Sequence, residues 1–335
     1  IVMPATMATL QTILKNFYIG PVREQLNMAT VLLAQVKKSS KEVVGEQVIL
    51  PLHVGRNWGI GARGTGGNGV LPTARNQQYN RAIFTTKDVY GRVEIRGKTI
   101  RATKTDKGAF LRAVQSEIQG MTKDLASDIN RQLYLGGDGV LTQVNGAQVG
   151  VTQITVDSTQ YLEEGQFLDI DNDTDVEVSS VDSATQFTKV GPAITVADND
   201  NVRLADVGAT DELNGLDLIV NNTGTLQNIT ATGIWRGNVF GADATPVILD
   251  EDDMQQAQDE SERRGGKVNL IVTSFGGRRM YINLLVDNKR FTSPQTGKLK
   301  GGYDHIDFNN IPLVVDRHCQ EAPTFTRAYF LSLDS

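Results

Sequence analysis

Seven glycines fall between positions 55 and 69, and a stretch this rich in glycine does not form a packed helix or strand. The strand-like run Val48-Ile49-Leu50 precedes the glycines. Residues 82–101 follow them, and from Val89 to Arg96 the residues alternate in character with a period of two. The pattern predicts an outgoing and a returning strand on either side of a flexible tip. We therefore expect a long extended hairpin.

The tip of this hairpin is expensive to order. Fixing a backbone costs ~1–2 kcal/mol per residue, so a tip of roughly thirty residues costs roughly 30–60 kcal/mol. One chain's own surface offers too little to offset that cost, and we expect the tip to be ordered only against a neighbouring molecule. Arginine and aromatic side chains are enriched at such contacts. The predicted assembly-interface residues are Arg56, Trp58, Arg63, Arg75, Arg81, Arg92 and Arg96. The alternative is a surface loop without a role.

The strongest helical pattern in the sequence follows the hairpin, over residues 105–135. Its apolar residues recur at spacings of three and four, which predicts one continuous apolar stripe: Phe110, Val114, Ile118, Met121, Leu125, Ile129 and Leu133. Thr105 and Asp106 are candidate caps at the start, and Gly136-Gly137 is a stop signal. At ~1.5 Å per residue such a helix is roughly 45 Å long.

The rest of the chain divides into three further patterns. Residues 10–36 predict one or two short helices broken at Gly20-Pro21, which we interpret as an arm outside the core. Residues 138–212 predict a small β-barrel or sandwich, with strands at 151–156, 167–170, 176–181 and 202–204. Beyond residue 213 the pattern is mixed α and β. It predicts a helix at 250–264, a buried strand at 268–272, a helix through 280–285 and closing strands at 311–315 and 327–333.

The net charge of −6 conceals a division within the chain. Up to Leu135 there are 19 Lys and Arg against 9 Asp and Glu, a balance of +10, and the remainder has 14 against 30, a balance of −16. Between Asp138 and Glu212 there are 15 acidic residues and only two basic ones, Lys189 and Arg203. Such a segment repels a nucleic-acid backbone. It is either a solvated acidic surface or a specific acidic binding face.

Residues with the spacing that catalysis or metal binding requires are scarce. The single cysteine, Cys319, excludes a disulfide framework, and His53, His305 and His318 are too scattered for a zinc site. We interpret Cys319 as a packing residue; its use as a nucleophile with a histidine is the less favoured alternative. No run of ~20 apolar residues is present to span a bilayer. The sequence predicts no catalytic, cofactor-binding or metal-binding residue.

Two motifs imitate known binding sites. Gly59, Gly61 and Gly64 fit a dinucleotide fingerprint, but the glycine-rich continuation after them does not start the helix that the fingerprint needs. The alternating acids from Asp169 to Asp175 resemble a calcium loop, yet Thr174 stands where the loop needs glycine. A looser divalent-cation site there is the alternative to exposed turn residues. The acids at 163–164 and 250–253 are explained by a turn and by a helix start.

The order of elements resembles the Hong Kong ninety-seven type fold of tailed-bacteriophage major capsid proteins. Several stretches are also similar to that family in amino-acid sequence: residues 18–26 (YIGPVREQL), 52–57 (LHVGRN), 130–133 (NRQL) and 308–317 (FNNIPLVVDR). The resemblance covers nearly the whole chain except the acidic β segment, which looks like an insertion. It implies an α+β capsid fold with an N-terminal arm, an extended hairpin loop, a long spine helix and an axial domain, plus an inserted small all-β domain.

The resemblance also implies a division of the chain. Residues 1–47 form an N-terminal arm, 48–104 the extended loop with its flanking strands, and 105–137 the spine helix of a peripheral domain. Residues 138–212 form the inserted acidic β domain, 213–301 the axial domain and 302–335 the C-terminal strands. Some members of the family link their subunits through a lysine in the extended loop, and here no lysine lies between Glu42 and Thr86. We therefore expect a noncovalent shell.

By the same resemblance the expected function is structural and not enzymatic. The chain would assemble with itself into pentamers and hexamers of an icosahedral shell, the virion capsid, which is built in the host cytoplasm and encloses double-stranded DNA by non-specific contact. Scaffold and portal proteins are expected partners, a decoration protein is left open, and no cofactor and no membrane are expected. The alternative is a phage or cell-surface receptor- or glycan-binding protein that uses the β insert as its binding module.

Overall fold

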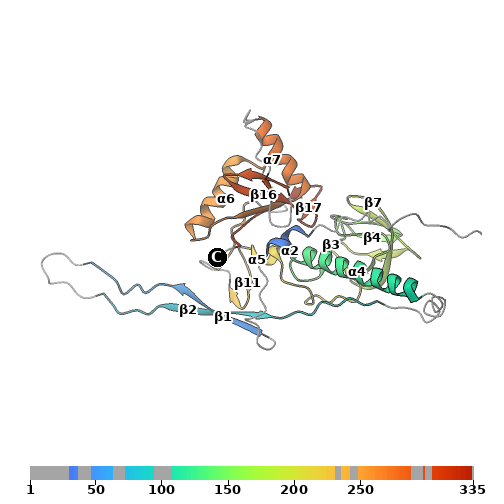
Figure 1. The fold of residues 1–335 in the computed structure, drawn as a ribbon, viewed down its shortest axis with the longest axis horizontal. Coiled ribbons are helices and arrows are strands. Elements are labelled where there is room, and N and C mark those ends of the chain that lie inside the picture. The colour runs from blue at the N-terminus through green and yellow to red at the C-terminus, as the bar shows by residue number, and fades with distance from the viewer. Residues whose placement is uncertain are drawn as a thin grey trace, which may run out of the picture.

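The protein is described by a computed structural model over residues 30–36, 47–62, 72–93, 107–230, 235–241, 248–287, 297–298 and 304–333. It is a mixed α+β chain with several separate sheets. A two-stranded ribbon and a long helix extend from a body that holds a five-stranded sheet and a β-barrel (Figure 1). Most of the predicted arm, the tip at 63–71, and the cap candidates Thr105 and Asp106 lie outside the described residues.

The ribbon consists of β1 (Gln47–Gly55) and β2 (Gln78–Thr85). They pair antiparallel from Gln47 opposite Thr85 to Gly55 opposite Gln78, with an irregularity between His53 and Gly55. The prediction that the returning strand runs to residue 101 is wrong for the described part, because residues 86–93 belong to no strand. They lie along the long helix instead, where a Cβ on Gly91 would come within 2.8 Å of the Met121 sulfur. The period of two at 89–93 therefore marks an extended chain without a ladder.

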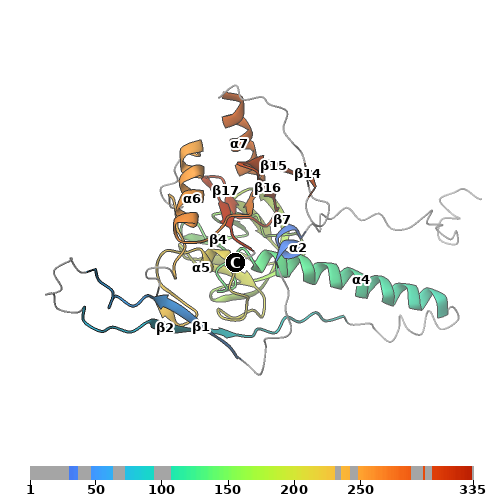
Figure 2. The same cartoon turned by 60° about the vertical axis from the view of Figure 1, so that its left-hand side comes forward.

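The long helix predicted from the apolar spacing is α4 (Lys107–Gln132). Its C-terminal turn is buried in the body through Asn130, Arg131 and Gln132. Further toward its start, Ile118 is 50% exposed, and α4 projects beyond the body in Figure 2. Among the described members of the predicted apolar stripe, Ile118 is exposed, whereas Met121, Leu125, Ile129 and Leu133 are partly buried.

The segment after α4 folds as a small antiparallel barrel. Its six-stranded sheet has the order β3-β10-β6-β7-β8-β5, and its edge strands meet through a bridge between Val144 and Val156. Ladder bonds from Asn145 N to Thr155 O and from Asp157 N to Gln143 O complete the closure. Of the two forms predicted for this segment, a barrel or a sandwich, the structure has the barrel. The barrel strands are β3 (Val140–Gln143), β5 (Gln153–Thr155), β6 (Phe167–Ile170), β7 (Asp173–Ser183), β8 (Gln186–Lys189) and β10 (Asn201–Leu204). A separate pair in the same segment is formed by β4 (Gln148–Val151) and β9 (Ile194–Val196).

Inward-pointing residues of these strands form one hydrophobic cluster inside the barrel. Phe187 and Ile154 are fully buried in it, and Leu168 and Val202 share the same interior. Alternation along each strand turns the polar residues outward. The barrel therefore has a core of its own.

The body is organised around a sheet in the order β14-β15-β16-β13-β19, in which only β13 and β16 are parallel. Its elements are α6 (Glu251–Arg263), β13 (Leu270–Thr273), α7 (Phe275–Asp287), β14 (Gly297–Lys298), β15 (Asp304–Phe308), β16 (Ile311–Val315) and β19 (Ala328–Leu331). Ile271 packs with Met254 of α6 and Tyr281 of α7 on one face. The predicted order of helix, buried strand, helix and two late strands is confirmed here.

The opposite face of this sheet is covered by segments from distant parts of the chain. Val272 and Val314 pack there with Tyr134 and with Val31 and Leu32 of α2 (Val31–Gln35). The prediction that residues 10–36 form an arm outside the core is wrong for residues 31–32, which are each 2% exposed. The remaining short elements are α5 (Leu216–Ile219), β11 (Thr225–Leu226), β12 (Ile229–Thr230), β17 (Glu321–Ala322) and β18 (Phe325–Thr326).

Candidate assembly surface

The β1–β2 ribbon exposes apolar side chains on both of its faces. Ile49 and Leu50 are 52% and 45% exposed, and as neighbours in a strand they point to opposite faces. Tyr79 is 72% exposed on the partner strand. A two-stranded hairpin without a covered face is marginally stable in water. The ribbon therefore leaves apolar side chains uncovered on both faces.

Five of the seven predicted interface residues lie in the described part of the ribbon and its continuation. The guanidinium of Arg56 lies 4.2 Å from the ring centre of Trp58, a cation–π contact just after β1. Arg75 lies before β2 on the facing leg. Arg81 is in β2 opposite Pro51, and Arg92 lies further on beside α4. Arg63 and Arg96 lie outside the described residues.

Gly59 lies where the chain after β1 and the chain before β2 come close to each other. A Cβ on Gly59 would come within 3.1 Å of Thr73 O and of Arg75 N on the opposite leg. Since both atoms belong to the backbone, neither can move aside for a side chain. The glycine thus permits a close approach of the two legs at Thr73 and Arg75. Gly64 and the residues that follow it, where the dinucleotide fingerprint needs a helix, lie outside the described residues.

Sequence reasoning missed an aromatic contact in the ribbon. The ring centres of His53 and Tyr79 are 5.2 Å apart, and His53 Nε2 lies 2.8 Å from Gln77 Oε1. The two rings sit directly opposite each other in the strand register. The sequence places Tyr79 in the returning strand, but the residue opposite Tyr79 can be identified only when the strand register is known. Ile60, 72% exposed, is a further missed member.

The base of the ribbon is fixed to the body. Ala82 is fully buried, and Ile83 N donates to Gln227 O at 3.0 Å beside the β11–β12 turn. Lys87 Nζ donates to Thr210 O just beyond the barrel. The ribbon is therefore anchored at one end and exposed along the remainder of its described length.

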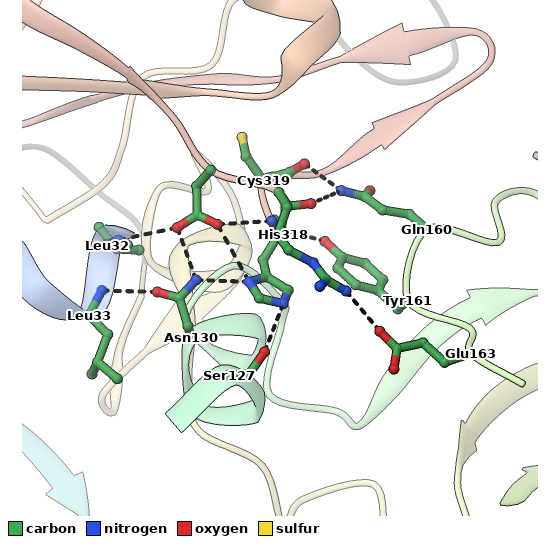
Figure 3. Close-up of polar contacts among 11 residues, drawn as sticks. Leu32, Leu33, Ser127, Asn130, Gln160, Tyr161, Glu163, His318 and Cys319 are labelled. Atoms are coloured by element: carbon green, nitrogen blue, oxygen red, sulfur yellow. Dashed lines mark hydrogen bonds and ion pairs between the residues drawn. The ribbon is translucent and has the colours of Figure 1, made fainter. Parts of the chain in front are cut away.

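Beneath this surface, a buried polar junction holds α2, α4 and the C-terminal segment together (Figure 3). Asn130 Oδ1 accepts from Leu33 N at 3.0 Å, which fixes the orientation of the amide. Asn130 Nδ2 then faces Asp316 Oδ2 and His318 Nδ1, each at 2.9 Å. Asp316 also accepts from Leu32 N at 3.2 Å. Nδ1 of His318 is therefore an acceptor, which leaves Nε2 to face Ser127 Oγ at 3.5 Å.

The barrel docks on the same C-terminal segment through one loop (Figure 3). Gln160 Nε2 donates to Arg317 O and to Cys319 O at 2.7 Å each, and Tyr161 Oη donates to His318 O at 2.7 Å. Glu163 forms an ion pair with Arg317 at 2.8 Å. A second attachment is the buried pair of Arg131 on α4 with Glu212 at the barrel exit. These bonds fix how the barrel is held against the body.

Buried ionisable groups around the junction have structural roles. Burial raises the pKa of the Cys319 thiol and of the Tyr161 phenol well above their ordinary values, so both stay protonated. Cys319 is completely buried among apolar residues. This confirms its interpretation as a packing residue, since a reactive cysteine needs a thiolate and solvent access.

The alternating acids at 169–175 act in turns. Asp169 accepts from Asp175 N at 3.0 Å and from Asp206 N at 3.1 Å, while Asp171 accepts from Asn201 N at 3.2 Å. Asp171 and Asp175 have positive φ, a conformation that aspartate tolerates in turns. Across the described ranges no three His, Cys, Asp or Glu side chains are grouped to hold a metal ion. Nor does any helix within those ranges have the length and apolar character to cross a membrane.

The chain was compared with known protein families, curated proteins and solved structures. No protein-family model matches the sequence, and no curated protein matches it. Among solved structures the chain is similar to one described as the cyanophage A-1(L) capsid asymmetric unit, with a TM-score of 0.59 and 15% sequence identity. The match covers 98% of this chain and 78% of that chain. The likeness shows that this chain has a phage capsid fold.

Proposed function

We propose that this chain is the major capsid protein of a tailed bacteriophage, a structural subunit and not an enzyme. One observation carries the proposal: an extended ribbon, exposed on both faces and bearing Arg56, Trp58 and Arg81, projects from a chain with a phage capsid fold. A ribbon of this kind is covered when it lies across a second copy. Arginine and tryptophan are the residue types that anchor such contacts.

The proposed assembly is head-to-tail. Different patches of one copy meet in each contact, and rotation closes the chains into pentamers and hexamers of an icosahedral shell around double-stranded DNA. The subunits are of the Hong Kong ninety-seven type, assemble in the host cytoplasm with scaffold and portal proteins, and become the virion capsid. No lysine lies between Glu42 and Thr86, so the shell is noncovalent. Ladders of linked subunits on a denaturing gel would contradict that.

The charge division suggests how the shell is oriented. The chain up to Leu135 has a balance of +10, and the segment from Asp138 to Glu212 has 15 acids and two bases. An acidic barrel near DNA phosphates would be repelled. In the proposed shell the barrel projects outward, away from the packaged DNA. A particle reconstruction with the barrel on the inner side would contradict this orientation.

Assembly of the purified chain tests the proposal. Expressed alone or with a scaffold protein, it should form megadalton shells or hexamers that sedimentation and electron microscopy detect. The combined change Arg56→Ala and Trp58→Ala removes exposed side chains, so monomer stability should change by less than about 0.5 kcal/mol. The critical concentration for assembly should rise at least about tenfold, equivalent to about 1.4 kcal/mol per contact. The matched control is Val149→Ala on the barrel, where the side chain is 79% exposed.

The alternative function predicts a different result. A receptor- or glycan-binding protein would stay small at high concentration and would bind its target through the barrel. A chain that remains a monomer under all assembly conditions, with unchanged behaviour in the ribbon variant, would remove the capsid proposal.

A further inference from the structure

Two helices on one face of the central sheet have opposite surface chemistry. α6 and α7 both pack on the Ile271 side of the sheet, through Met254 and Tyr281, and they lie next to each other in Figures 1 and 2. Each therefore has an outer face that the sheet does not cover. The two outer faces differ in charge and in apolar content.

The outer face of α6 is acidic. The helix holds six carboxylates and one arginine, and Asp252, Asp259 and Glu262 are exposed while Met254 is buried. Asp259 and Glu262 accept hydrogen bonds from the neutral amides of Gln255 and Gln258. These contacts orient the carboxylates without neutralising them. We call Asp252, Asp259 and Glu262 the α6 acidic face.

Not all of the acid on α6 is available in this way. Glu260 pairs with Arg263 at 2.6 Å and with Arg264 at 3.3 Å. The two basic residues at the end of the helix are thus directed to one carboxylate. The α6 acidic face lies beside this pair and keeps its negative charge.

The outer face of α7 is apolar and basic. Phe275, Arg279 and Ile282 follow each other at spacings of four and three, which places them on one stripe of the helix. Phe275 is 45% exposed and Ile282 is 39% exposed. The Arg279 side chain is 73% exposed, and its contact with Glu321 is long, at 3.5 Å. We call these three residues the α7 stripe.

We infer that the α6 acidic face of one copy binds the α7 stripe of the next copy in the ring, with Arg279 between the carboxylates of the neighbour. This inference rests on the proposed function, because it specifies which surfaces meet in head-to-tail assembly. A heterologous contact joins two different patches of the same chain, and here the two patches are complementary in charge. The charges fix the register and the partner, while Phe275 and Ile282 supply apolar area.

A charge exchange within one chain tests the pairing. Asp259→Lys alone and Arg279→Glu alone each place like charges in every contact, so each should raise the critical concentration for shell assembly at least tenfold. The double variant, Asp259→Lys with Arg279→Glu, restores opposite charges between neighbouring copies. It should assemble within threefold of the original chain. Glu164→Lys, an exposed charge reversal on the barrel, is the matched control and should not change the critical concentration.

The outcomes separate this inference from the function on which it rests. If the unaltered chain forms no shells, the proposed function fails and the inference fails with it. If shells form and both single reversals assemble normally, only the pairing of α6 with α7 is wrong. If the single reversals block assembly and the double variant does not recover, the partner surface lies elsewhere, for example on the ribbon arginines.

Disulfide crosslinking tests the contact between α6 and α7 without relying on charge. Chains with Asp259→Cys and chains with Arg279→Cys are mixed, assembled and oxidised. Disulfide-linked dimers should form in the mixture and not in either variant alone, and the buried Cys319 takes no part. Shells without linked dimers would overturn the pairing.

Discussion

The side-chain amide of Asn130 donates to a carboxylate oxygen of Asp316 at 2.9 Å, across 186 positions of sequence. Both residues are almost fully buried, and the pair joins the end of α4 to the segment after β16. Leu32 N and Leu33 N complete the contact from α2. One polar junction therefore holds together α2, the end of α4 and the segment after β16.

Replacing Asn130 tests that dependence. Asn130→Leu leaves Leu33 N without its acceptor and removes a donor from the buried Asp316. We expect a loss of about 3 kcal/mol in the free energy of unfolding, because unsatisfied buried polar groups, charged ones above all, are costly. Urea titration of the monomer measures it. Ser127→Ala removes only the 3.5 Å contact to His318 and should cost less than about 1 kcal/mol; equal losses would contradict the special role of Asn130.

Acid should weaken the same junction. Burial by itself favours the neutral acid, but hydrogen bonds from the Asn130 amide and from the backbone N–H groups of His318 and Leu32 lower the pKa of Asp316 below its ordinary value. A lowered pKa in the folded state gives stability that is present above the unfolded value of ~3.9 and is lost as the pH falls through the folded value.

The measurement is the free energy of unfolding from about pH 5 to about pH 2. It should fall with decreasing pH in the original chain and less steeply in Asp316→Asn, which cannot be protonated in this range. Glu164→Gln, an exposed change on the barrel, serves as the control and should keep the original slope. A slope in Asp316→Asn as steep as the original would rule out this source of acid sensitivity.

The ion pair of Arg131 with Glu212 makes a distinct prediction about the barrel attachment. Burial opposes the charge of Arg131, but hydrogen bonds and the charges of Glu212 and Asp128 raise its pKa. Arg131→Met should cost about 3–5 kcal/mol, since it leaves the buried Glu212 carboxylate without its partner. Glu212→Gln should cost less, because Arg131 keeps its ion pair with Asp128 at 2.8 Å. The double change should cost less than the sum of the two, as a double-mutant cycle would show. The pair of Arg263 with Glu260, whose arginine side chain is 75% exposed, is the control, with an expected coupling below about 1 kcal/mol.

Two glycines should respond in opposite directions to alanine. A Cβ on Gly215 would come within 2.3 Å of Gln132 O and 2.4 Å of Leu135 O, where α5 approaches the end of α4. Gly215→Ala must displace backbone and should cost more than about 3 kcal/mol. Gly120 in α4 has nothing within 4 Å of a Cβ, so Gly120→Ala should stabilise the helix by about 0.5–1 kcal/mol. Thermal unfolding of both variants checks the signs, and a neutral Gly215→Ala would contradict the close approach.

Elements with a local signal were predictable from the sequence. The apolar spacing of three and four located α4, and acids after Asp250 located the start of α6, whose first amide is capped by the Asp250 carboxylate. Strand runs bounded by Asp, Asn and Gly located the barrel. Helix periodicity, capping and turn chemistry all act over a few residues, so they can be read without knowing the fold.

Contacts between distant segments were not predictable in this way. Nothing near Leu32 marks it as a core residue, because its burial depends on a sheet that forms about 240 residues later. The end of β2 at Thr85 depends on where β1 begins, and the alternation at 89–93 has no opposite strand in the described chain.

The sequence alone therefore determined the kinds of elements, their order and the separation of basic from acidic segments. Only the tertiary structure decided that α2 belongs to the core, that Asn130 meets Asp316 and that Arg131 meets Glu212. The physical reason is range: propensity and periodicity are properties of neighbouring residues, whereas a buried hydrogen bond or ion pair needs two partners that packing alone brings together.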